Sequence, residues 1–379
     1  MKRLLLLGGG HTHVEVIRRF GADPPPGTAI VLVSPDRHTA YSGMLPGYIA
    51  GHYGFQDCHI DLARLCHTTR VAFRRTEATA IDATAHRVEC NGGDGYEYDL
   101  VSIDVGSTQP AHEIPGAAQH ALTVKPVGRF IEAWDEIRAT ARATPAPRRI
   151  VLVGGGAAGV ELALAMHHRL LRDGLAASTA INLVTDAPEI LPGHPRQVRR
   201  VIETIMRGRG IVVHAGSRVT KVELGVLYHE HATLPADWVV LANGAAAPDW
   251  LRNSGLALDD RGFVLVNDAL QSVSCPEAFA AGDVANMVNH ARPKSGVVAV
   301  RQGPPLTENL RRALARKPLI TYRPQKTVLA LISTGNRYAV ASWNGLALWG
   351  SWVWRWKHRI DCRFMATYRC DSKRDEPPA

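Results

Sequence analysis

The chain repeats itself, and the repeat limits the folds it can adopt. A short apolar segment and a glycine-rich turn occur twice: residues 4–16 read LLLLGGGHTHVEV and residues 150–162 read IVLVGGGAAGVEL. Two further pairs, 30–34 with 181–185 and 99–106 with 237–244, follow in the same order. Continuous apolar runs of this length are typical of strands buried on both faces of a parallel sheet. A strand, a tight turn and a helix form half of a βαβ unit, so we expect an α/β chain with two nucleotide-binding domains.

The second turn carries the complete G-x-G-x-x-G spacing in Gly154, Gly156 and Gly159. The first glycine permits the tight turn, the second lets the backbone approach a pyrophosphate, and the third lets helix and strand pack closely. Phosphates then bind the free N–H groups at the positive end of the helix. The alternative is a tight turn with a purely structural role.

The first turn keeps Gly8 and Gly10 but has His13 where the third glycine belongs. A histidine there needs more room between helix and strand than glycine does. His11 and His13 could also be interpreted as a metal pair, but two histidines without a third ligand make a poor site. We therefore predict no metal site.

The acid that binds a ribose hydroxyl is expected about 20 residues after the glycines, at the end of the second strand. Ser34 holds this place in the first copy, with Asp36 close behind, and Thr185 holds it in the second, followed by Asp186. An acid one or two residues late either reaches the ribose or only caps the turn. The sequence therefore does not distinguish NADH from NADPH.

A third signal lies at residues 278–284, AFAAGDV, where an apolar strand ends in Gly282 and Asp283. Alone, this is a strand-to-turn corner. After two nucleotide-binding units it resembles the second FAD fingerprint of flavoproteins with two dinucleotide-binding domains. In that fingerprint the acid binds the ribityl or phosphate region of the flavin.

Over about residues 2–309, these signals together resemble the pyridine-nucleotide-dependent flavoprotein oxidoreductases with two Rossmann domains. The type II NADH:quinone dehydrogenase-like branch is the most similar. Three features also resemble the oxidoreductase domain fused to selenide, water dikinase: the GGGHTH start at residues 8–13, segment 41–47 (YSGMLPG) and Lys125-Pro126. The resemblance implies FAD and NAD(P)H as cofactors, hydride transfer to the flavin, and electron transfer to a quinone or similar acceptor. The alternative is an FAD-binding redox sensor or partner subunit with weak turnover, which His13 and the displaced ribose acids favour.

The resemblance also assigns roles to single residues. Glu161, Lys125 and Gln302 would lie near the reacting rings, although a helix-dipole role for Glu161 and a solvated surface role for Lys125 stay open. Residues 296–303 should open a helix whose N-terminus faces the flavin, but only Ala299 and Gln302 remain of the pattern common in quinone reductases. The implied FAD-binding residues are Gly8, Gly10, His11, Ser34, Pro46, Gly106, Gly282, Asp283 and Ala299, and those for NAD(P)H are Gly154, Gly156, Gly159 and Asp186.

Composition and cysteine spacing exclude several classes. The six cysteines form no close pair, and Cys58 and Cys66 are eight residues apart, so a disulfide reductase is not expected. No cysteine lies between Cys90 and Cys275, where sulfide:quinone reductases need one. The net charge of +9 favours an anionic partner, but we find no nucleic-acid-binding motif. No apolar run approaches the ~18 residues of a membrane span, so we expect a cytoplasmic protein, peripheral at most at the cytoplasmic face of the membrane.

Five of the eight tryptophans lie in the last 40 residues, together with an excess of basic residues. Residues 328–333 and 338–342 are predicted to form a hairpin. Trp349, Trp352 and Trp356 keep the spacing of a following helix, although Trp352, Trp354 and Trp356 also alternate as in a strand. Contact with a lipid interface, a homodimer contact and a lid over the flavin domain stay open for this segment. We expect an FAD domain over residues 1–115 and 259–318, an inserted NAD(P)H domain over 116–258, and a C-terminal hairpin and helix over 319–379.

Overall fold

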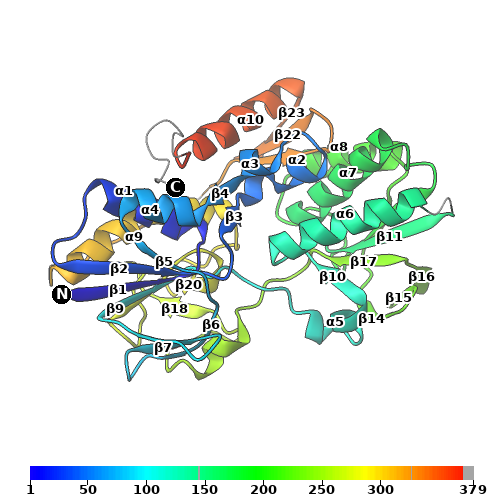
Figure 1. Ribbon diagram of the computed structural model, residues 1–379. Helices are drawn as coiled ribbons and strands as arrows, with labels where there is room; N and C mark the ends of the chain where they lie inside the picture. The colour runs from blue at the N-terminus through cyan, green and yellow to red at the C-terminus, as the bar shows by residue number, and fades with distance from the viewer. Residues whose placement is uncertain (144–145, 326, 370–379) are drawn as a thin grey trace, which may run out of the picture.

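The computed structural model describes residues 1–143, 146–325 and 327–369. The structure has two halves, and the half that contains the N-terminus, called the first half below, is built on a parallel five-stranded sheet in the order β19-β9-β1-β2-β5. These strands are β1 (Lys2–Leu7), β2 (Thr28–Val33), β5 (Ala72–Arg74), β9 (Leu100–Ile103) and β19 (Ala278–Ala280). Helices α1 (His11–Ala22), α4 (Leu62–Thr69) and α9 (Gly296–Leu314) cover one face of this sheet (Figure 1). The four leucines of β1 are buried, as expected for a central parallel strand.

The second half repeats this plan in the order β10-β17-β11-β12-β13. The strands are β10 (Ala121–Thr123), β11 (Arg148–Val153), β12 (Thr179–Val184), β13 (Val212–His214) and β17 (Trp238–Leu241). The helices are α5 (Ala117–His120), α6 (Val127–Ala143), α7 (Ala157–Arg172) and α8 (Arg196–Gly208). Figure 1 shows the two halves side by side, which confirms the predicted fold class of two Rossmann-like units.

Shorter elements complete both halves. Each half carries a three-stranded antiparallel sheet, β6-β7-β8 in the first and β14-β15-β16 in the second. Their bounds are β6 (Ala78–Asp82), β7 (Arg87–Cys90), β8 (Gly95–Glu97), β14 (Val219–Glu223), β15 (Val226–His229) and β16 (Ala232–Pro235). The remaining short elements in this part are β3 (His38–Ala40), η1 (Ser42–Met44), α2 (Leu45–Ile49), α3 (Phe55–Cys58), β4 (His59–Asp61), η2 (Ala111–Glu113), η3 (Asp249–Asn253), β18 (Val264–Val266), η4 (Gly282–Val284) and β20 (Ala285–Met287). Leu45 and Ile49 of α2 join the core of the second half, so this helix links the halves.

The C-terminal part differs from the sequence prediction by one strand. The hairpin of β21 (Ala330–Ser333) and β22 (Ala339–Trp343) is present, but a third strand, β23 (Leu346–Gly350), pairs antiparallel with β22. Helix α10 (Ser351–Ala366) begins only after it, so placing Trp349 in the helix was wrong. Gly350 has φ +143°, and the chain turns there from strand into helix.

Helix α10 reaches from the second half across to the first (Figure 1). Near its start, Val353 packs against β22, and near its end Met365 joins the core of the first half. Among the described residues, no helix is both long enough and apolar enough to cross a membrane. The domain boundaries given above remain a proposal.

Candidate active site

The first glycine loop joins β1 to α1 and is closed by a buried histidine. Gly8 has φ +87°, and a Cβ there would lie 2.4 Å from the backbone oxygen of Asp104, so only glycine fits. His13 is fully buried; its Nδ1 lies 2.7 Å from the Gly8 oxygen and its Nε2 lies 2.8 Å from Ser102 Oγ. Burial lowers the pKa of His13 to about 4, so the ring is neutral at pH 7. The imidazole thus fills the space between helix and strand and satisfies two buried polar groups.

The second glycine loop joins β11 to α7 and follows the G-x-G-x-x-G geometry closely. A Cβ on Gly159 would lie 1.9 Å from the oxygen of Gly154, so the helix can pack here only without a side chain. A Cβ on Gly156 would meet no heavy atom within 4 Å. This open space before the start of α7 is where the pattern requires a pyrophosphate to lie, so the loop fits a dinucleotide.

Three segments meet at the carboxylate of Asp283, which lies in η4. Lys125 Nζ lies 2.7 Å from Asp283 Oδ2, and Ser107 Oγ lies 3.3 Å from the same oxygen. Lys125 also donates to Ser107 Oγ at 2.7 Å, so the loop after Gly106 is tied to the same group. The side chains of Lys125 and Asp283 are 39% and 17% exposed, respectively, which leaves room for a ligand at their edge. Lys125 is therefore engaged with a predicted cofactor residue and does not point freely into solvent.

His11 opens α1 close to this ion pair. Its ring lies 5.5 Å from that of Tyr41, centroid to centroid. Burial lowers the pKa of His11 to about 4, with the charge of Asp283 opposing this shift and that of Lys125 adding to it. His11 is therefore a neutral hydrogen-bonding group at the mouth of the first glycine loop.

Helix α9 starts beside η4, as the sequence predicted for residues 296–303. Gln302 is buried, and its Oε1 accepts a hydrogen bond of 2.7 Å from the Gly282 N–H. The Ala299 oxygen accepts a hydrogen bond of 2.9 Å from Thr12 Oγ1. These bonds fix the start of α9 against η4 and against the start of α1, so Gln302 and Ala299 act here as positioning groups.

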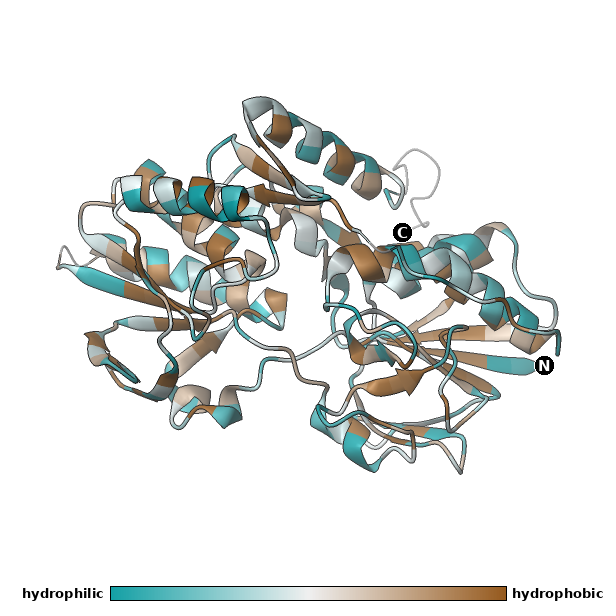
Figure 2. Ribbon diagram, turned by 180° about the vertical axis from the view of Figure 1, so that it is seen from behind, coloured by the Kyte–Doolittle hydropathy of each residue, from teal (hydrophilic) through white to brown (hydrophobic). Residues whose placement is uncertain are grey.

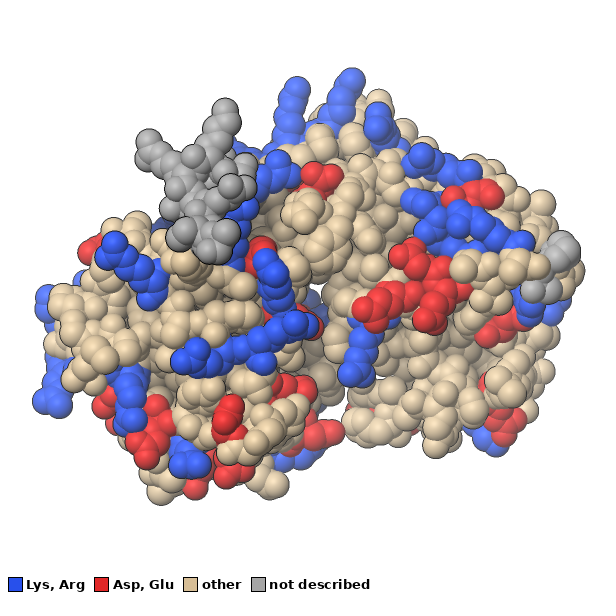
Figure 3. All heavy atoms as spheres, in the orientation of Figure 1, with Lys and Arg blue, Asp and Glu red and all other residues tan. Residues whose placement is uncertain are grey.

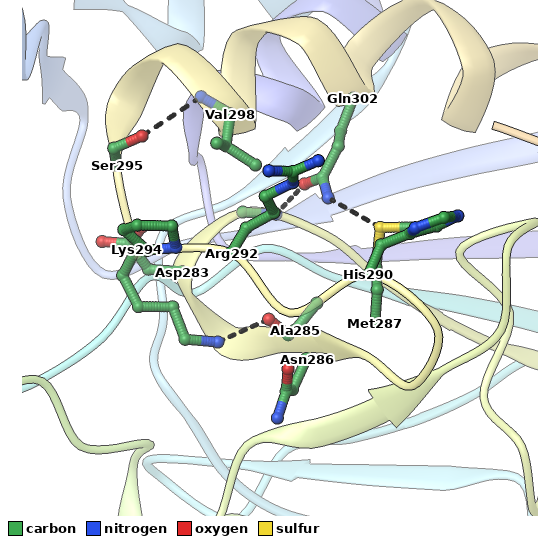
Figure 4. Close-up of a pocket in the computed structure, with 12 residues that line it drawn as sticks. Asp283, Ala285, Asn286, Met287, His290, Arg292, Lys294, Ser295, Val298 and Gln302 are labelled. Carbon is green, nitrogen blue, oxygen red and sulfur yellow. Dashed lines mark hydrogen bonds between the residues drawn. The ribbon is translucent and has the colours of Figure 1, made fainter. Parts of the chain in front are cut away.

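A pocket lies between η4 and the start of α9 (Figure 4). It is lined by Gly282, Asp283, Ala285, Asn286, Met287, His290, Arg292, Pro293, Lys294, Ser295, Val298 and Gln302. Lys294 Nζ donates to the Ala285 oxygen at 2.5 Å and lies 3.8 Å from the centroid of the Phe263 ring. Burial lowers the pKa of Lys294 to about 8. Lys294 is not among the residues predicted from the sequence, although residues 290–294 (HARPK) hold three basic side chains shortly before α9.

Glu161 lies on α7 and faces the C-terminal sheet. Its Oε1 accepts hydrogen bonds from Ser333 N at 2.7 Å and Ser333 Oγ at 2.9 Å. It is the fifth residue of α7, so it lies beyond the first turn, where a carboxylate best complements the helix dipole. Burial raises the pKa of Glu161, while the charge of Lys357 on α10 opposes this shift.

A buried ion pair from α10 lies beside this glutamate and was missed by the sequence analysis. Lys357 Nζ lies 2.7 Å from Asp361 Oδ2 and also donates to the Gly43 oxygen at 2.5 Å. The ring of Tyr41 stacks on that of Phe364 at 4.3 Å. The C-terminal helix therefore contributes charged groups to the junction of the two halves, where Figure 3 shows the surface hollowed.

The other predicted residues are less closely engaged. Ser34 is buried, and its Oγ donates to the Asp36 oxygen at 3.3 Å. Asp186 is exposed just after β12. Pro46 is buried within α2. In the described part of the chain no three His, Cys, Asp or Glu residues form a group able to hold a metal ion.

Residues 2–303 match the family described as "Pyridine nucleotide-disulphide oxidoreductase". One relative, the demethylphylloquinone reductase NdbB of Synechocystis sp., is 26% identical over 92% of this chain and 88% of its own length. The NADH dehydrogenase-like protein YutJ of Bacillus subtilis is 25% identical over 76% of this chain and 78% of its own.

Two solved structures share the fold over nearly the whole chain. The sulfide:quinone oxidoreductase of Aquifex aeolicus superposes with a TM-score of 0.81 at 19% identity, covering 97% of this chain and 92% of its own. NDH2 from Plasmodium falciparum in complex with NADH gives a TM-score of 0.81 at 13% identity, covering 97% of both chains. These two structures confirm the predicted fold class, and the family match over residues 2–303 confirms the family resemblance.

Proposed function

Because the chain belongs to the pyridine nucleotide-disulphide oxidoreductase family, whose cofactors are FAD and NAD(P)H, we propose that it transfers hydride from a reduced nicotinamide to FAD and passes the electrons to a quinone. The observation that carries this proposal is the pair of glycine loops, one at the start of α1 and one at the start of α7, in the two halves of a single chain. The loop before α7 would hold NAD(P)H, and the loop before α1, together with Asp283, would hold FAD.

The flavin, when bound, supplies the redox chemistry, and the residues of this chain bind it and set its surroundings. The start of α9, fixed by the hydrogen bond from Gly282 to Gln302, would present a positive helix end to the ring. Lys125, fixed on Asp283 and Ser107, would lie at the ring edge. Glu161, held by Ser333, would lie where nicotinamide and flavin meet and is suited to hold a proton.

The state of Cys58 and Cys66 argues against a disulfide substrate as the electron acceptor. Cys58 and Cys66 are buried and free, and burial raises the pKa of each thiol to about 12. Neither thiol is therefore a nucleophile at neutral pH. The relatives point to quinones: besides NdbB, the type II NADH:quinone oxidoreductase of Staphylococcus saprophyticus is 22% identical over 84% of both chains.

The outer face of α10 supports contact with a membrane surface. Trp352 and Ile360 are 47% and 42% exposed on one stripe of the helix, and Trp356 between them is partly buried against the cluster of Ala339, Ala341 and Val353. The exposed Arg355, Arg359 and Arg363 form a second stripe beside it. Figure 2 shows the resulting alternation of apolar and polar bands along this helix.

Next to α10, an apolar groove of about 320 Å³ is lined by Leu329, Ala341, Trp343, Leu346, Leu348, Trp352 and Trp356. Aromatic rings over a basic stripe suit the headgroup layer of an anionic bilayer. We propose that this face rests on the cytoplasmic side of the membrane. The alternative is that a second copy of this chain covers the same groove in a homodimer.

Anaerobic stopped-flow mixing of the holoprotein with NADH or NADPH tests the proposed reaction. We expect loss of the flavin absorbance band with at least one donor, and its return when a short-chain quinone is added in a second mix. An oxidised flavin that stays unchanged with both donors would refute the enzyme and leave the redox-sensor alternative. Reduction followed by no faster reoxidation with quinone than with buffer would refute the acceptor alone.

A further inference from the structure

The internal duplication allows the two glycine loops to be compared position by position, and they differ in one buried residue. Asp104 follows β9, and Ala242 follows β17 at the equivalent place. Both backbones are fixed in the same way: Asp104 N donates to the Leu7 oxygen at 2.8 Å, and Ala242 N donates to the Val153 oxygen at 2.8 Å. At this position the first copy therefore carries a carboxyl group next to its glycine loop, and the second copy carries a methyl group.

This carboxyl group occupies space that is open in the second copy. A Cβ on Gly10 would lie 2.3 Å from the Asp104 carboxyl carbon, whereas a Cβ on the equivalent Gly156 would meet nothing within 4 Å. Asp104 Oδ2 accepts hydrogen bonds from Thr12 N at 2.9 Å and His13 N at 3.0 Å. Two of the free N–H groups at the start of α1, which this kind of loop offers to a pyrophosphate, are thus already occupied.

The other carboxyl oxygen faces the second FAD-type segment. A Cβ on Gly282 would lie 2.4 Å from Asp104 Oδ1. Asp104 is 2% exposed, and among the described residues no lysine or arginine forms a hydrogen bond or ion pair with its carboxyl group. Asp104 therefore lies between the start of α1 and η4, where the proposed site would hold the FAD diphosphate, and no cation of the described chain pairs with it.

A carboxylate and a diphosphate at one helix start repel each other, and the low dielectric of the interior strengthens this repulsion. We propose that Asp104 is a proton switch for FAD binding: it has to carry a proton when the diphosphate lies at the start of α1, so binding of FAD takes up one proton. The inference rests on FAD binding and does not depend on the identity of the electron acceptor.

The charged neighbours leave Asp104 as the group that titrates near neutrality. Burial raises the pKa of Asp104 to about 7, with the N–H groups of His13 and Thr12 opposing the shift and Asp283 adding to it. His11 and His13 on α1 have pKa values lowered to about 4 by burial, so both stay neutral between pH 6 and 8. On η4, Asp283 is paired with Lys125 at 2.7 Å. Burial lowers the pKa of Lys294 in the adjoining pocket to about 8, so its titration also contributes to the pH dependence of FAD binding and has to be separated from that of Asp104.

Thermodynamic linkage gives the direction in which the Kd for FAD changes with pH. If bound FAD raises the proton affinity of Asp104, FAD binds more weakly as pH rises above the pKa of about 7. Between pH 6 and 8 this single group increases the Kd about tenfold. Loss of the Lys294 charge adds a factor of about two over the same range.

Equilibrium release of FAD from the holoprotein tests the proposal. The holoprotein is diluted serially at pH 6, 7 and 8, and free FAD is measured in the ultrafiltrate. We expect the Kd to rise between pH 6 and 8 about ten times more in the wild type than in Asp104→Asn, whose residual slope reports Lys294. Asp104→Ala, which installs the residue of the second copy, should behave like Asp104→Asn. Asp99→Asn, an equivalent change at an exposed position just before the same strand, should follow the wild type.

Two outcomes would overturn the proposal. One is a wild-type Kd that is flat from pH 6 to 8, which can be observed even if neither Asp104 variant folds. The other is Asp104→Asn with the same pH slope as the wild type, since the titrating group would then lie elsewhere. Tighter FAD binding by Asp104→Asn at pH 8, with no change at pH 6, supports it.

Discussion

Replacing Trp352 by alanine tests whether the outer face of α10 lies on lipid. The residue is 47% exposed at the edge of the apolar groove. A tryptophan side chain can bury roughly 200 Å², so about 100 Å² of this one remains available to a bilayer. At ~25 cal/mol per Å², full burial of that area would contribute ~2.5 kcal/mol, and a ring at headgroup depth realises part of it. We expect a loss of about 1–2 kcal/mol, which lowers the vesicle partition coefficient roughly 5- to 30-fold.

The assay is co-sedimentation with vesicles of neutral lipid and of mixed neutral and anionic lipid. Leu224→Ala is the matched control, because Leu224 is 87% exposed in the turn between β14 and β15, away from α10. Arg359→Gln should weaken binding by about 1 kcal/mol, and only to the anionic vesicles. The melting temperature should stay the same in all three variants because none of these side chains lies in a core cluster.

Equal partitioning of Trp352→Ala and Leu224→Ala would refute the lipid assignment. If Trp352→Ala instead converts a dimer into a monomer in size-exclusion chromatography, a second copy of the chain covers the groove. Both experiments use the full chain, so neither depends on α10 folding in isolation.

Four further substitutions test the proposed cofactor sites. Gly159→Ala should lower the free energy of unfolding by about 1–3 kcal/mol, because its Cβ would lie 1.9 Å from the Gly154 oxygen. Gly156→Ala should keep the melting temperature and lose NAD(P)H affinity in a binding titration, because its Cβ would point into open space. Glu161→Gln keeps an acceptor for Ser333 but cannot ionise, and burial raises the pKa of Glu161 in the wild type. We therefore expect the pH dependence of flavin reoxidation by quinone to flatten in this variant, while the rate of flavin reduction changes less than about threefold. Lys125→Met removes the cation 2.7 Å from Asp283 and should lower the FAD affinity about tenfold, and an unchanged FAD content after gel filtration would contradict this role.

Local sequence signals predicted the two parallel sheets and their glycine loops. The runs before Gly8 and Gly154 are apolar without interruption, and this pattern arises wherever a strand is covered on both faces. Asp283 was found in the same way, because a strand that ends in glycine and an acid is a local feature. The structure adds the partners of Asp283, which come from residues 107 and 125 and are separated from it by more than 150 positions.

Features that depend on contacts between distant segments could not be predicted from the sequence. Asp104 is one polar residue at the end of an apolar strand, and only the packing of Gly10 and Gly282 against it reveals its place between two FAD-type segments. Strand β23 was missed because its side chains are mostly exposed and lack the alternation that marks a half-buried strand. Trp349 and Trp352 then kept a helical spacing across the break at Gly350 by coincidence.

Helix α10 connects the proposed lipid contact with the proposed reaction. Its outer face carries Trp352 and Arg355, and its inner face carries Lys357, which bonds the Gly43 oxygen and Asp361. An α-helix with its side chains is about 10–12 Å thick, so a quinone in the bilayer would have to cross little more than this thickness to reach the junction of the two halves. Trp352→Ala should therefore raise the KM for a long-chain quinone in vesicles and leave the KM for a water-soluble quinone unchanged. An equal change for both quinones would mean that the acceptor enters by a route that does not pass the lipid-facing side of α10.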